Sequence, residues 1–583
     1  MPKKWIVKNK YPQKFADNLP GYNPVVLQLL FDRGLDTHKK VDEFLNPDYT
    51  QDIFDPFLFN EMQKAVDRIN EAIEKQEKIL IYGDYDADGV TASAVLFKTL
   101  EKLGAENIKV FIPHRETDGY GLNLKNCQKF INEKINLIIT VDCGITNVEQ
   151  IDFLKKAKLD VIVTDHHIEA KKLPNAVAIL DPSVKKENYP FKKLAGVGVA
   201  FKLAQALFDL QNNPEELESF EKWLLDLVTI GTIGDVSPIL GENRTLIKYG
   251  LMVLNKTSRK GLQELIRACS LSNGHNPNNE IPLGQNLYEL SVRNVSWQIV
   301  PRINAAGRID HANLAYNLLT TEDEIEAIAL ARDISEKNLK RQKIAEQMMI
   351  EAEEIFGEVN LDQKILIAVK ENWQAGVVGL VAGKLKDKYN RPVILFSQNK
   401  NIYIGSGRSI SEFNITQGLQ ESDEFLEKYG GHSQACGLSL IGQKNYKNFI
   451  KKINKIANEK LKNVELVPTI EIDVELKMQD LNWELWDELK KFEPYAEANP
   501  LPLFLIRNVK IEKMDIIGKK NNTLRFSLSQ NGQMQKAIAF GVAEEWGSQI
   551  KTGDLVDVVV EFGVNEWKGN RELQFKIVDF KNL

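Results

Sequence analysis

The adjacent pair His166 and His167, with Asp165 before it, directly follows the apolar run 161–163. The run consists of β-branched residues, so it predicts a buried strand with the three polar side chains at its carboxyl end. Imidazole and carboxylate groups are costly to bury at such a position unless something binds them. A metal ion binds both kinds of group, so this segment predicts a metal centre.

Two earlier segments repeat the arrangement of a strand followed by carboxylates. The acidic residues at these strand ends are Asp84, Asp86, Asp88 and Asp142. Each segment leads into a helical pattern, which gives the β-α-β alternation of a parallel sheet in an α/β fold. The carboxyl ends of parallel strands lie at one edge of such a sheet, so we expect these carboxylates to meet the histidines there.

A fourth acidic segment places Asp235 after the apolar stretch 224–228 and completes a set of oxygen and nitrogen ligands without thiolates. Such a set suits Mn²⁺ or Mg²⁺, and two of these ions can share carboxylates. Each residue alone has an ordinary explanation, because an aspartate after a strand is commonly a helix N-cap and a single histidine is commonly a hydrogen-bonded structural residue. Four such segments in one chain favour the metal centre.

Four short motifs carry a resemblance to a known family. They are Asp86-Ala87-Asp88-Gly89, Asp142-Cys143-Gly144, Asp165-His166-His167 and Gly234-Asp235, which resemble the ordered motifs of the DHH phosphoesterase superfamily. Segments 405–409 and 430–437 resemble its DHH-associated domain, and segments 84–89 and 301–308 resemble its bacterial exonucleases. The resemblance implies a single-stranded-DNA-specific 5′→3′ exonuclease that releases 5′-mononucleotides in DNA recombination and repair.

The resemblance also implies which residues bind two Mn²⁺ or Mg²⁺ ions. The expected ligands are Asp84, Asp86, Asp88, Asp142, His166, His167 and Asp235. Asp142 is expected to bridge the ions. Asp86 is expected at one ion, with His166 as a candidate partner, and Asp88 and Asp235 at the other, with His167 as a candidate partner; which histidine faces which ion is left open. Many members of the superfamily carry a histidine where this chain has Tyr82, and Asp84 is expected to replace it.

Two such ions would make phosphodiester hydrolysis possible. Ions about 3.5–4 Å apart lower the pKa of a water between them and neutralise the charge that develops on the phosphate oxygens. The expected catalytic residues are Asp142, His166, His167 and Asp165. Asp165 is expected to act by orienting a histidine rather than by binding a metal itself.

Substrate contacts are also inferred from the resemblance. The expected phosphate-binding residues are Arg115, Arg302, Arg308, Ser406, Arg408 and His432. Arg115 is the candidate for a terminal 5′ phosphate, and Arg302 and Arg308 for phosphates that follow. Glycines beside Ser406 and His432 would let backbone N–H groups approach an anion. The alternative explanation of these glycines is that they form hairpin turns. The alternative explanation of the arginines is that they are ordinary surface residues.

The sequence pattern divides the chain into five segments. We expect a leader at 1–50, a DHH catalytic domain at 51–320, a connecting helix at 321–356, a DHH-associated substrate-binding domain at 357–462 and an OB-fold nucleic-acid-binding domain at 463–583. The helix is predicted by a charged stretch without glycine or proline that ends at Gly357. Short alternating strands after residue 465 predict a small barrel, and the resemblance implies the OB fold. Candidates for base stacking on it are Phe526, Phe540 and Trp567, although a place in the core is the favoured explanation of each.

Composition bounds the class of protein. With 583 residues, the chain is long enough for three or four domains. It has no apolar run of about 18 residues and no signal-peptide pattern, and its cysteines are scattered, so we expect a soluble cytoplasmic protein with reduced thiols. The net charge of −6 argues against a broadly basic surface, so a DNA-binding groove would be basic only locally, as at 332–343 and 384–391.

Two other functions fit parts of the pattern. A smaller superfamily member would hydrolyse short oligonucleotides or cyclic dinucleotides, but it needs no additional barrel. A non-catalytic replication scaffold would lack the metal ligands, which are present here. The resemblance implies single-stranded DNA as substrate, and a RecQ-type helicase and a single-strand binding protein as partners of a monomer that does not bind membranes. No docking motif for either partner is visible in the sequence.

Overall fold

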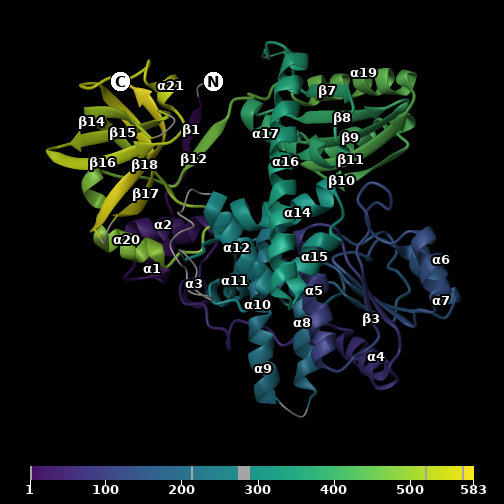
Figure 1. Ribbon diagram of the computed structural model, residues 1–583. Helices are drawn as coiled ribbons and strands as arrows, with labels where there is room; N and C mark the ends of the chain where they lie inside the picture. Colours follow the sequence, from purple (N-terminus) through teal and green to yellow (C-terminus); the bar gives the residue numbers. More distant parts are fainter. Residues whose placement is uncertain (1–2, 212–213, 273–288, 361, 519–520, 568–569) are drawn as a thin grey trace. The chain divides into compact units, whose positions relative to one another are not determined.

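The computed structural model describes residues 3–211, 214–272, 289–360, 362–518, 521–567 and 570–583. The side chains of residues 214–215, 270–272 and 567 lie outside this description. The chain forms two compact units, which we describe separately (Figure 1). The larger unit holds residues 54–237 and 246–468, and the smaller unit holds residues 1–53, 238–245 and 469–583.

A five-stranded parallel sheet, in the order β3-β2-β4-β5-β6, begins the larger unit. Its strands are β2 Ile79–Tyr82, β3 Ile108–Phe111, β4 Leu137–Val141, β5 Asp160–Thr164 and β6 Ala178–Leu180. The accompanying helices are α4 Met62–Glu74, α5 Ala87–Lys102, α6 Leu124–Asn132, α7 Val148–Lys156 and α8 Gly196–Asp209. β2 and β4 are buried throughout, as expected for parallel strands covered on both faces. The predicted parallel α/β sheet is therefore confirmed.

A group of helices follows this sheet and belongs to the larger unit, except for residues 241–245, which belong to the smaller unit. They are α9 Pro214–Trp223, α10 Leu225–Gly234, α11 Gly241–Leu254, α12 Lys260–Ser272, α13 Val292–Asn294, the π-helical segment η2 Val295–Ile299, α14 Val300–Ile309 and α15 Asn313–Thr320. A short 3₁₀ helix, η1 Pro56–Leu58, precedes α4. The apolar stretch 224–228 thus lies at the start of a helix, α10, unlike the runs before the other acidic motifs, which are strands.

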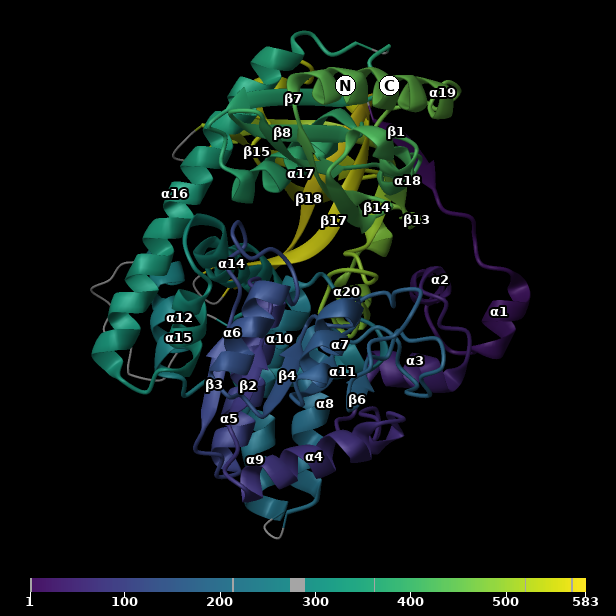
Figure 2. The ribbon, with the colours of Figure 1, turned by 90° about the vertical axis from the view of Figure 1, so that its right-hand side faces the viewer.

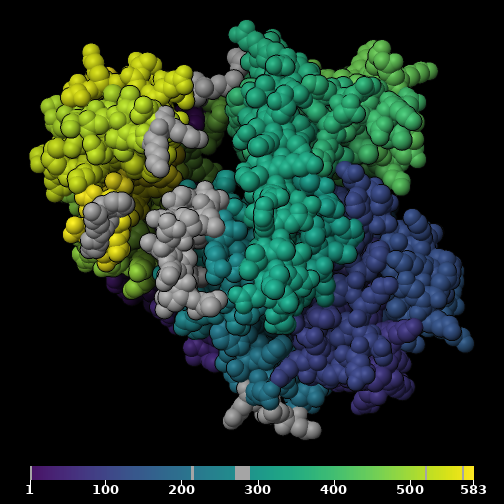
Figure 3. All heavy atoms as spheres, viewed as in Figure 1, coloured from purple at the N-terminus to yellow at the C-terminus, as the bar shows by residue number. Residues whose placement is uncertain are grey.

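The charged stretch before Gly357 forms a single helix, α16 Glu324–Phe356, as predicted. The Asp323 side chain caps its first turn by accepting the Glu326 N–H, and Gly357 ends it with a φ of 63°. The helix packs against α12, α14 and α15 at one end and against α17 and β7 at the other (Figures 1 and 2). Figure 3 shows its outer side exposed along the larger unit. A helix this polar is held in place by the elements at both ends.

A second, mixed sheet completes the larger unit, in the order β10-β11-β9-β8-β7. Its strands are β7 Leu366–Glu371, β8 Val393–Asn399, β9 Ile402–Arg408, β10 Lys428–His432 and β11 Ala435–Ile441. The helices are α17 Ala375–Tyr389, α18 Ile415–Gln420 and α19 Gln443–Lys460, with the 3₁₀ helix η3 Asp423–Phe425. β9 is antiparallel to β8 and β11, so Arg408 lies opposite Ala435 at the end of the sheet.

The smaller unit is built around a barrel. Its later elements are β12 Thr469–Ile472, β13 Val474–Glu475, η4 Met478–Asp480, α20 Trp483–Lys490, β14 Leu503–Ile517, β15 Thr523–Gln530, β16 Gln533–Ala539, α21 Ala543–Trp546, β17 Leu555–Trp567 and β18 Asn570–Asn582. Strand β14 pairs with both β15 and β17, which closes the sheet. This closed barrel confirms the predicted run of short strands.

The segment predicted as a leader is folded with this barrel. It forms β1 Lys4–Val7, α1 Gln13–Asn18, α2 Pro24–Asp32 and α3 His38–Leu45. β1 pairs in parallel with β12, and buried residues of α2 such as Leu29 and Leu30 belong to the same core as barrel residues. The predicted leader is therefore part of the smaller unit, a role that its short sequence did not indicate.

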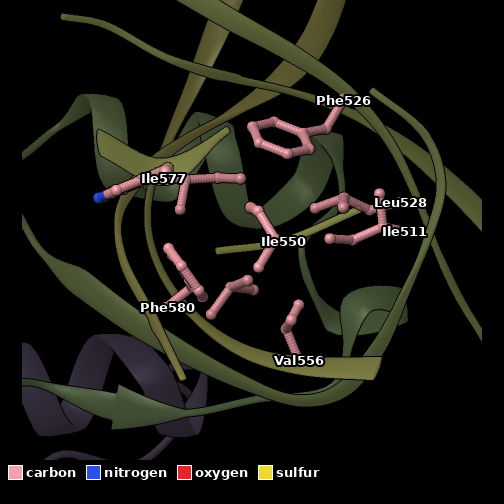
Figure 4. Close-up of a pocket in the computed structure, with 9 residues that line it drawn as sticks. Ile511, Phe526, Leu528, Ile550, Val556, Ile577 and Phe580 are labelled. Carbon is pink, nitrogen blue, oxygen red and sulfur yellow. The ribbon is translucent and has the colours of Figure 1, made fainter. Parts of the chain in front are cut away.

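The barrel interior is apolar. A small cavity is lined by Ile511, Phe526, Leu528, Trp546, Ile550, Val556, Val558, Ile577 and Phe580. Figure 4 shows the seven of these side chains that it labels turned toward one another. The space is about large enough for one water molecule and offers it no polar partner, so it is part of the packed core. Phe526, a candidate for base stacking, is 2% exposed and belongs to this core. Among the described residues, no helix is long and apolar enough to cross a membrane.

Candidate metal centre

The carboxyl ends of β2, β4 and β5 bring the predicted metal ligands together. Potential ligand atoms lie within 4.8 Å of one another in three overlapping groups: Asp84, Asp86 and Asp142; Asp142, His166 and His167; and Asp88, His166 and Asp235. Three of the four contributing segments are strand ends, and the fourth is the end of helix α10, which supplies Asp235. All seven predicted ligands therefore converge in the structure.

Asp142 lies at the centre of these groups. It belongs to two of them, and its Oδ1 is 3.1 Å from Nε2 of His166. Both atoms are buried without a hydrogen-bond partner, which a shared cation would supply. Backbone packing fixes this position, because a Cβ on Gly196 would lie 2.6 Å from Cβ of Asp142. The geometry fits a ligand that is shared by two ions.

Asp86 and Asp88 are held by helix ends. Oδ1 of Asp86 caps α5 by accepting N–H groups of Asp88 and Gly89, so the N-cap explanation of this residue is correct and its second oxygen is left for a cation. The oxygens of Asp88 accept the N–H groups of Gly196 and Val197 at 2.7 and 2.8 Å, at the start of α8. Both carboxylates are therefore oriented before any metal binds.

The carboxylates of this centre are poorly stabilised without a cation. Burial, and then the charge of neighbouring carboxylates, raises the pKa of Asp84 and Asp142 well above the usual value. Burial and the charge of Asp235 raise the pKa of Asp88 to about 7. Divalent cations would reverse this effect, since their charge favours the ionised carboxylates. The donor set contains carboxylate and imidazole groups, which fits Mn²⁺ and Mg²⁺.

Asp165 orients a histidine. Its Oδ1 lies 2.8 Å from Nδ1 of His167, and its Oδ2 accepts the Ile145 N–H at 2.9 Å. Burial opposes ionisation of this carboxyl, but the hydrogen bond to His167 and the nearby positive charge hold its pKa below the usual value. An ionised Asp165 that occupies Nδ1 leaves Nε2 of His167 for a metal ion.

The two histidines lie near different carboxylates. His166 lies within reach of both Asp88 and Asp235, at 3.8 and 3.9 Å, as well as of Asp142. His167 instead lies near Asp142, with Nδ1 of His167 4.0 Å from Oδ1 of Asp142. The structure therefore groups Asp88 and Asp235 with His166, a choice between the histidines that the sequence left open.

The predicted phosphate-binding arginines gather beside the carboxylates. The guanidinium of Arg115 stacks on Tyr85 at 3.9 Å from the ring centre. Burial, and then the charge of Arg115, lowers the pKa of Arg308 to about 9. The pKa of Arg408 is lowered by burial and by Arg115, although the Cys436 thiol partly offsets this. Such mutual repulsion among buried cations favours binding of an anion.

Contacts to neighbouring oxygens position these arginines. Arg408 donates to Oγ of Ser406 at 3.1 Å and to the Gly407 carbonyl at 2.8 Å. Arg308 donates to the Gly376 carbonyl at 3.1 Å, and Arg302 donates to the Gln298 carbonyl at 2.8 Å. His432 is exposed at the end of β10, where its carbonyl accepts from Thr416. Ser406 thus contacts the arginine cluster through its hydrogen bond with Arg408. Among the described residues, the structure shows no hydrogen bond between the His432 ring and these arginines.

Several residues of this centre had not been identified from the sequence. Arg341 on α16 interacts electrostatically with Arg302 and Arg308. Asn304 on α14 accepts the Ala87 N–H at 2.9 Å and so holds the turn that carries Asp86. Asp181 follows β6 and influences His166, and its position after an apolar run was the signal that could have identified it. Arg341 lies in the locally basic stretch 332–343, but nothing there distinguishes it from the other charged residues of the helix.

The aromatic candidates of the barrel differ in exposure. Phe540 is 59% exposed, so it stays a candidate for stacking on a base. The ring of Phe526 is in the core, which was the favoured explanation of this residue, so it is not a stacking candidate. The side chain of Trp567 lies outside the described residues.

Comparison with known proteins identifies the family. Family models match three parts of the chain: the DHH family N-terminal domain at 78–232, the DHHA1 domain at 362–459 and the RecJ OB domain at 472–579. The single-stranded-DNA-specific exonuclease RecJ of Bacillus subtilis is 38% identical over 558 residues, which cover 95% of this chain and 68% of the relative. The Haemophilus influenzae exonuclease of that name is 31% identical, with 99% of each chain covered. The chain belongs to the RecJ family.

Solved RecJ structures have the same fold. The crystal structure of Thermus thermophilus RecJ in complex with Mn²⁺ matches with a TM-score of 0.81 and 27% identity, and the match covers 100% of this chain and 80% of that one. The complex of that protein with Mg²⁺ gives a TM-score of 0.76 at 26% identity, covering 100% and 78% of the two chains. The parallel-sheet domain and the OB-fold barrel are thus features of the RecJ fold.

Proposed function

We propose that this protein is a metal-dependent exonuclease specific for single-stranded DNA, which works in the 5′→3′ direction and releases 5′-mononucleotides. The observation that carries the proposal is the position of the seven converging metal ligands beside the arginine cluster. Cations would stabilise the clustered carboxylates, and anions would stabilise the clustered arginines. A nucleic acid phosphate with bound divalent metal satisfies both requirements. The RecJ relatives, named as single-stranded-DNA-specific exonucleases, support this assignment.

Two Mn²⁺ or Mg²⁺ ions are the cofactors that these ligands fit. When bound, the ions would lower the pKa of a water molecule and neutralise charge that develops on the attacked phosphate. Asp142 is shared between the two groups of ligands, and His166 connects it with Asp88 and Asp235. Asp165 holds the ring of His167 in place through the contact at Nδ1. The role of the protein is to fix these side chains before the substrate arrives.

The arginine cluster supplies the direction of cleavage. We assign Arg115, Arg308 and Arg408, with Ser406, to a terminal 5′ phosphate beside the metal centre. Arg302 is assigned to a following phosphate. Contacts to phosphates hold a strand without reading its sequence, which suits an enzyme that degrades any single strand. His432 is an additional candidate for phosphate binding. It lies on β10, which pairs with β11, and Gly437 of β11 lies opposite Ser406.

The remaining assignments follow the family. We propose that residues 51–320 form the catalytic domain and 357–462 the substrate-binding domain, joined by the helix at 321–356, and that residues 463–583 bind single-stranded DNA. We also propose that a monomer acts in the cytoplasm, in recombination and repair, with a RecQ-type helicase that unwinds DNA and a single-strand binding protein as partners. Both partners would provide or hold the single strand that the exonuclease requires.

An end-labelling experiment tests the proposal. Purified protein is incubated with single-stranded DNA labelled at the 5′ or the 3′ end, with a duplex control, in Mn²⁺, in Mg²⁺ and in EDTA. We expect metal-dependent release of mononucleotides from the 5′ end of the single strand, and no release by an Asp142→Ala variant. Turnover of very short oligonucleotides only would instead identify a scavenging phosphodiesterase. Binding without cleavage would identify a scaffold.

A further inference from the structure

Two large apolar side chains are exposed in segments that adjoin elements of the metal centre. Val236 is 63% exposed and directly follows the ligand Asp235. Trp297 is 76% exposed and lies in the π-helical segment η2, which leads into α14. Both residues are in the larger unit. Large apolar side chains of a folded chain are usually buried, so this pair requires an explanation.

The backbone of Val236 is strained. Its φ is 61°, in the left-handed region that β-branched residues rarely adopt. The Val236 N–H donates to the Ile233 carbonyl, and the Ser237 N–H donates to the Thr232 carbonyl. These two hydrogen bonds form a Schellman motif at the end of helix α10. Glycine or asparagine usually takes this position, because neither is strained there. The side chain is exposed, so core packing does not offset the strain, and a function in binding is the remaining explanation.

Trp297 lies in an equally unusual backbone. A π-helical turn is rare and is commonly found at functional sites. The next residue, Gln298, accepts a hydrogen bond from Arg302 at 2.8 Å, which links this turn to the arginine-bearing helix α14. The indole therefore stands on a backbone of defined shape, with three quarters of its surface exposed to solvent.

Helix α14 relates Trp297 to the metal centre. A Cβ on Gly234, the residue before Asp235, would lie 3.5 Å from the methyl groups of Val300. One turn later, Asn304 accepts the N–H of Ala87, and the helix ends near Arg308 of the arginine cluster. Val300, Asn304 and Arg308 thus follow one another along one side of the helix. Trp297 lies one turn before Val300 and continues this series beyond Asp235. Arg308 and the indole are thus about three helical turns apart along this stretch, with Arg302 between them.

We propose that Val236 and Trp297 form a stacking platform for the bases on the 3′ side of the scissile phosphate. The inference rests on the proposed exonuclease function and adds to it the way in which the strand is held. A 5′ phosphate at the arginines and a scissile phosphate at the metals would direct the following nucleotides toward Val236 and then Trp297. An aromatic face stacks on any base, which agrees with an enzyme that does not select sequence.

Kinetics on defined substrates test the platform. Stacking by one aromatic residue predicts that Trp297→Ala raises the KM for 5′-phosphorylated single-stranded DNA by about 5- to 150-fold, with kcat little changed. Hydrolysis of a dinucleotide, which is too short to reach Trp297, is expected to stay at the wild-type rate. On DNA with abasic sites at its second to fourth nucleotides, wild type and variant are expected to be equal. An equal loss on every substrate, or no loss on long DNA, would overturn the proposal.

Control variants separate binding from folding. Trp297→Phe is expected to restore most of the affinity, since it keeps an aromatic face. Trp223→Ala removes another exposed tryptophan of the larger unit, 42% exposed on α9, and is expected to behave as wild type. Val236→Gly relieves the strained backbone, so its Tm should be unchanged or higher while its KM for single-stranded DNA rises. A lower Tm with unchanged KM would contradict the role of Val236.

A binding measurement separates this inference from the proposed function. The fluorescent base analogue 2-aminopurine is placed at each of the first five nucleotides, and the DNA is bound by an Asp142→Asn variant with Mn²⁺. We expect quenching at the nucleotides that stack on the indole, and loss of this quenching when Trp297→Ala is added. Equal fluorescence in the two variants would refute the platform, whereas failure of the wild type to cleave any single strand would refute the exonuclease.

Discussion

The Asp165 carboxylate lies 2.8 Å from Nδ1 of His167 and is itself held by the backbone N–H of Ile145. This hydrogen bond fixes the position of the imidazole, whose Nδ1 also lies 4.0 Å from Oδ1 of the metal ligand Asp142. An aspartate that binds no metal thus controls how a metal ligand is presented.

Replacement of Asp165 by asparagine is expected to weaken metal binding. The amide keeps the size of the side chain but removes the negative charge that supports His167. Loss of such a supporting partner typically lowers metal affinity or activity by about 10- to 100-fold. Activity measured across a Mn²⁺ titration should therefore saturate at a higher metal concentration. An unchanged Mn²⁺ midpoint would show that Asp165 only stabilises the fold.

The stability of the metal-free protein is expected to depend on pH. Burial and neighbouring carboxylates raise the pKa of Asp84 and Asp142, and raise that of Asp88 to about 7. The folded state then binds protons more tightly than the unfolded chain does, so stability is lost as the pH rises from about 4 to about 7. We expect a lower Tm in EDTA at about pH 8 than at about pH 5. An Asp142→Asn variant should show a smaller difference.

Metal should reverse this pH dependence. Ions that bind the folded state at 100 times their dissociation constant add about 2.7 kcal/mol to its stability. Because protons compete with the metal for the carboxylates, the gain in Tm on adding Mn²⁺ should be larger at about pH 8 than at about pH 5. A gain that is equal at both pH values would indicate that the raised pKa values do not belong to metal ligands. Melting curves with and without Mn²⁺ provide the measurement.

Arg408→Lys is expected to reduce the preference for a 5′ phosphate. Lysine keeps the charge but cannot form the planar pair of hydrogen bonds that a guanidinium makes with phosphate, and it loses the contact with Ser406. We expect about a 10-fold or larger fall in kcat/KM on 5′-phosphorylated DNA, corresponding to about 1.4 kcal/mol. DNA with a 5′ hydroxyl should be affected much less. Equal losses on both substrates would place Arg408 at another phosphate.

Arg244 is expected to stabilise the smaller unit without affecting the chemistry. This buried guanidinium donates to the carbonyls of Phe44, Phe492 and Glu493 at 2.6, 3.0 and 2.8 Å. Arg244→Met would leave several buried carbonyls unsatisfied, at about 1–3 kcal/mol each. We expect a marked fall in the melting temperature of this unit, while hydrolysis of a dinucleotide at low temperature stays near the wild-type rate. Loss of dinucleotide hydrolysis in a folded variant would contradict this separation.

The strand-end ligands could be predicted because their signal is local. A β-branched run that ends in aspartate or histidine identifies both the strand and the edge where its polar residue lies, and this held for Asp86, Asp142 and His166. The helix α16 was predicted for a similar reason, since a long stretch without glycine or proline has few other structures available.

Other features depend on contacts that sequence spacing does not encode. Which of His166 and His167 joins Asp88 is decided by side-chain rotamers and by the hydrogen bond to Asp165. Arg341 appears in the sequence as one more charge on an exposed helix, and only the packing of α16 against α14 brings it to the other arginines. The first 50 residues were misjudged because their apolar positions are completed by a core from the other end of the chain.

One carboxylate, Asp86, both caps helix α5 and offers an oxygen to the metal centre. The first turn of this helix is therefore held by hydrogen bonds that do not require a cation. Metal ions can leave and return without unwinding the helix, and one kind of divalent ion can be exchanged for another. Removal of metal with a chelator should thus abolish activity reversibly, because the helix and its capping carboxylate keep their positions until metal is added again.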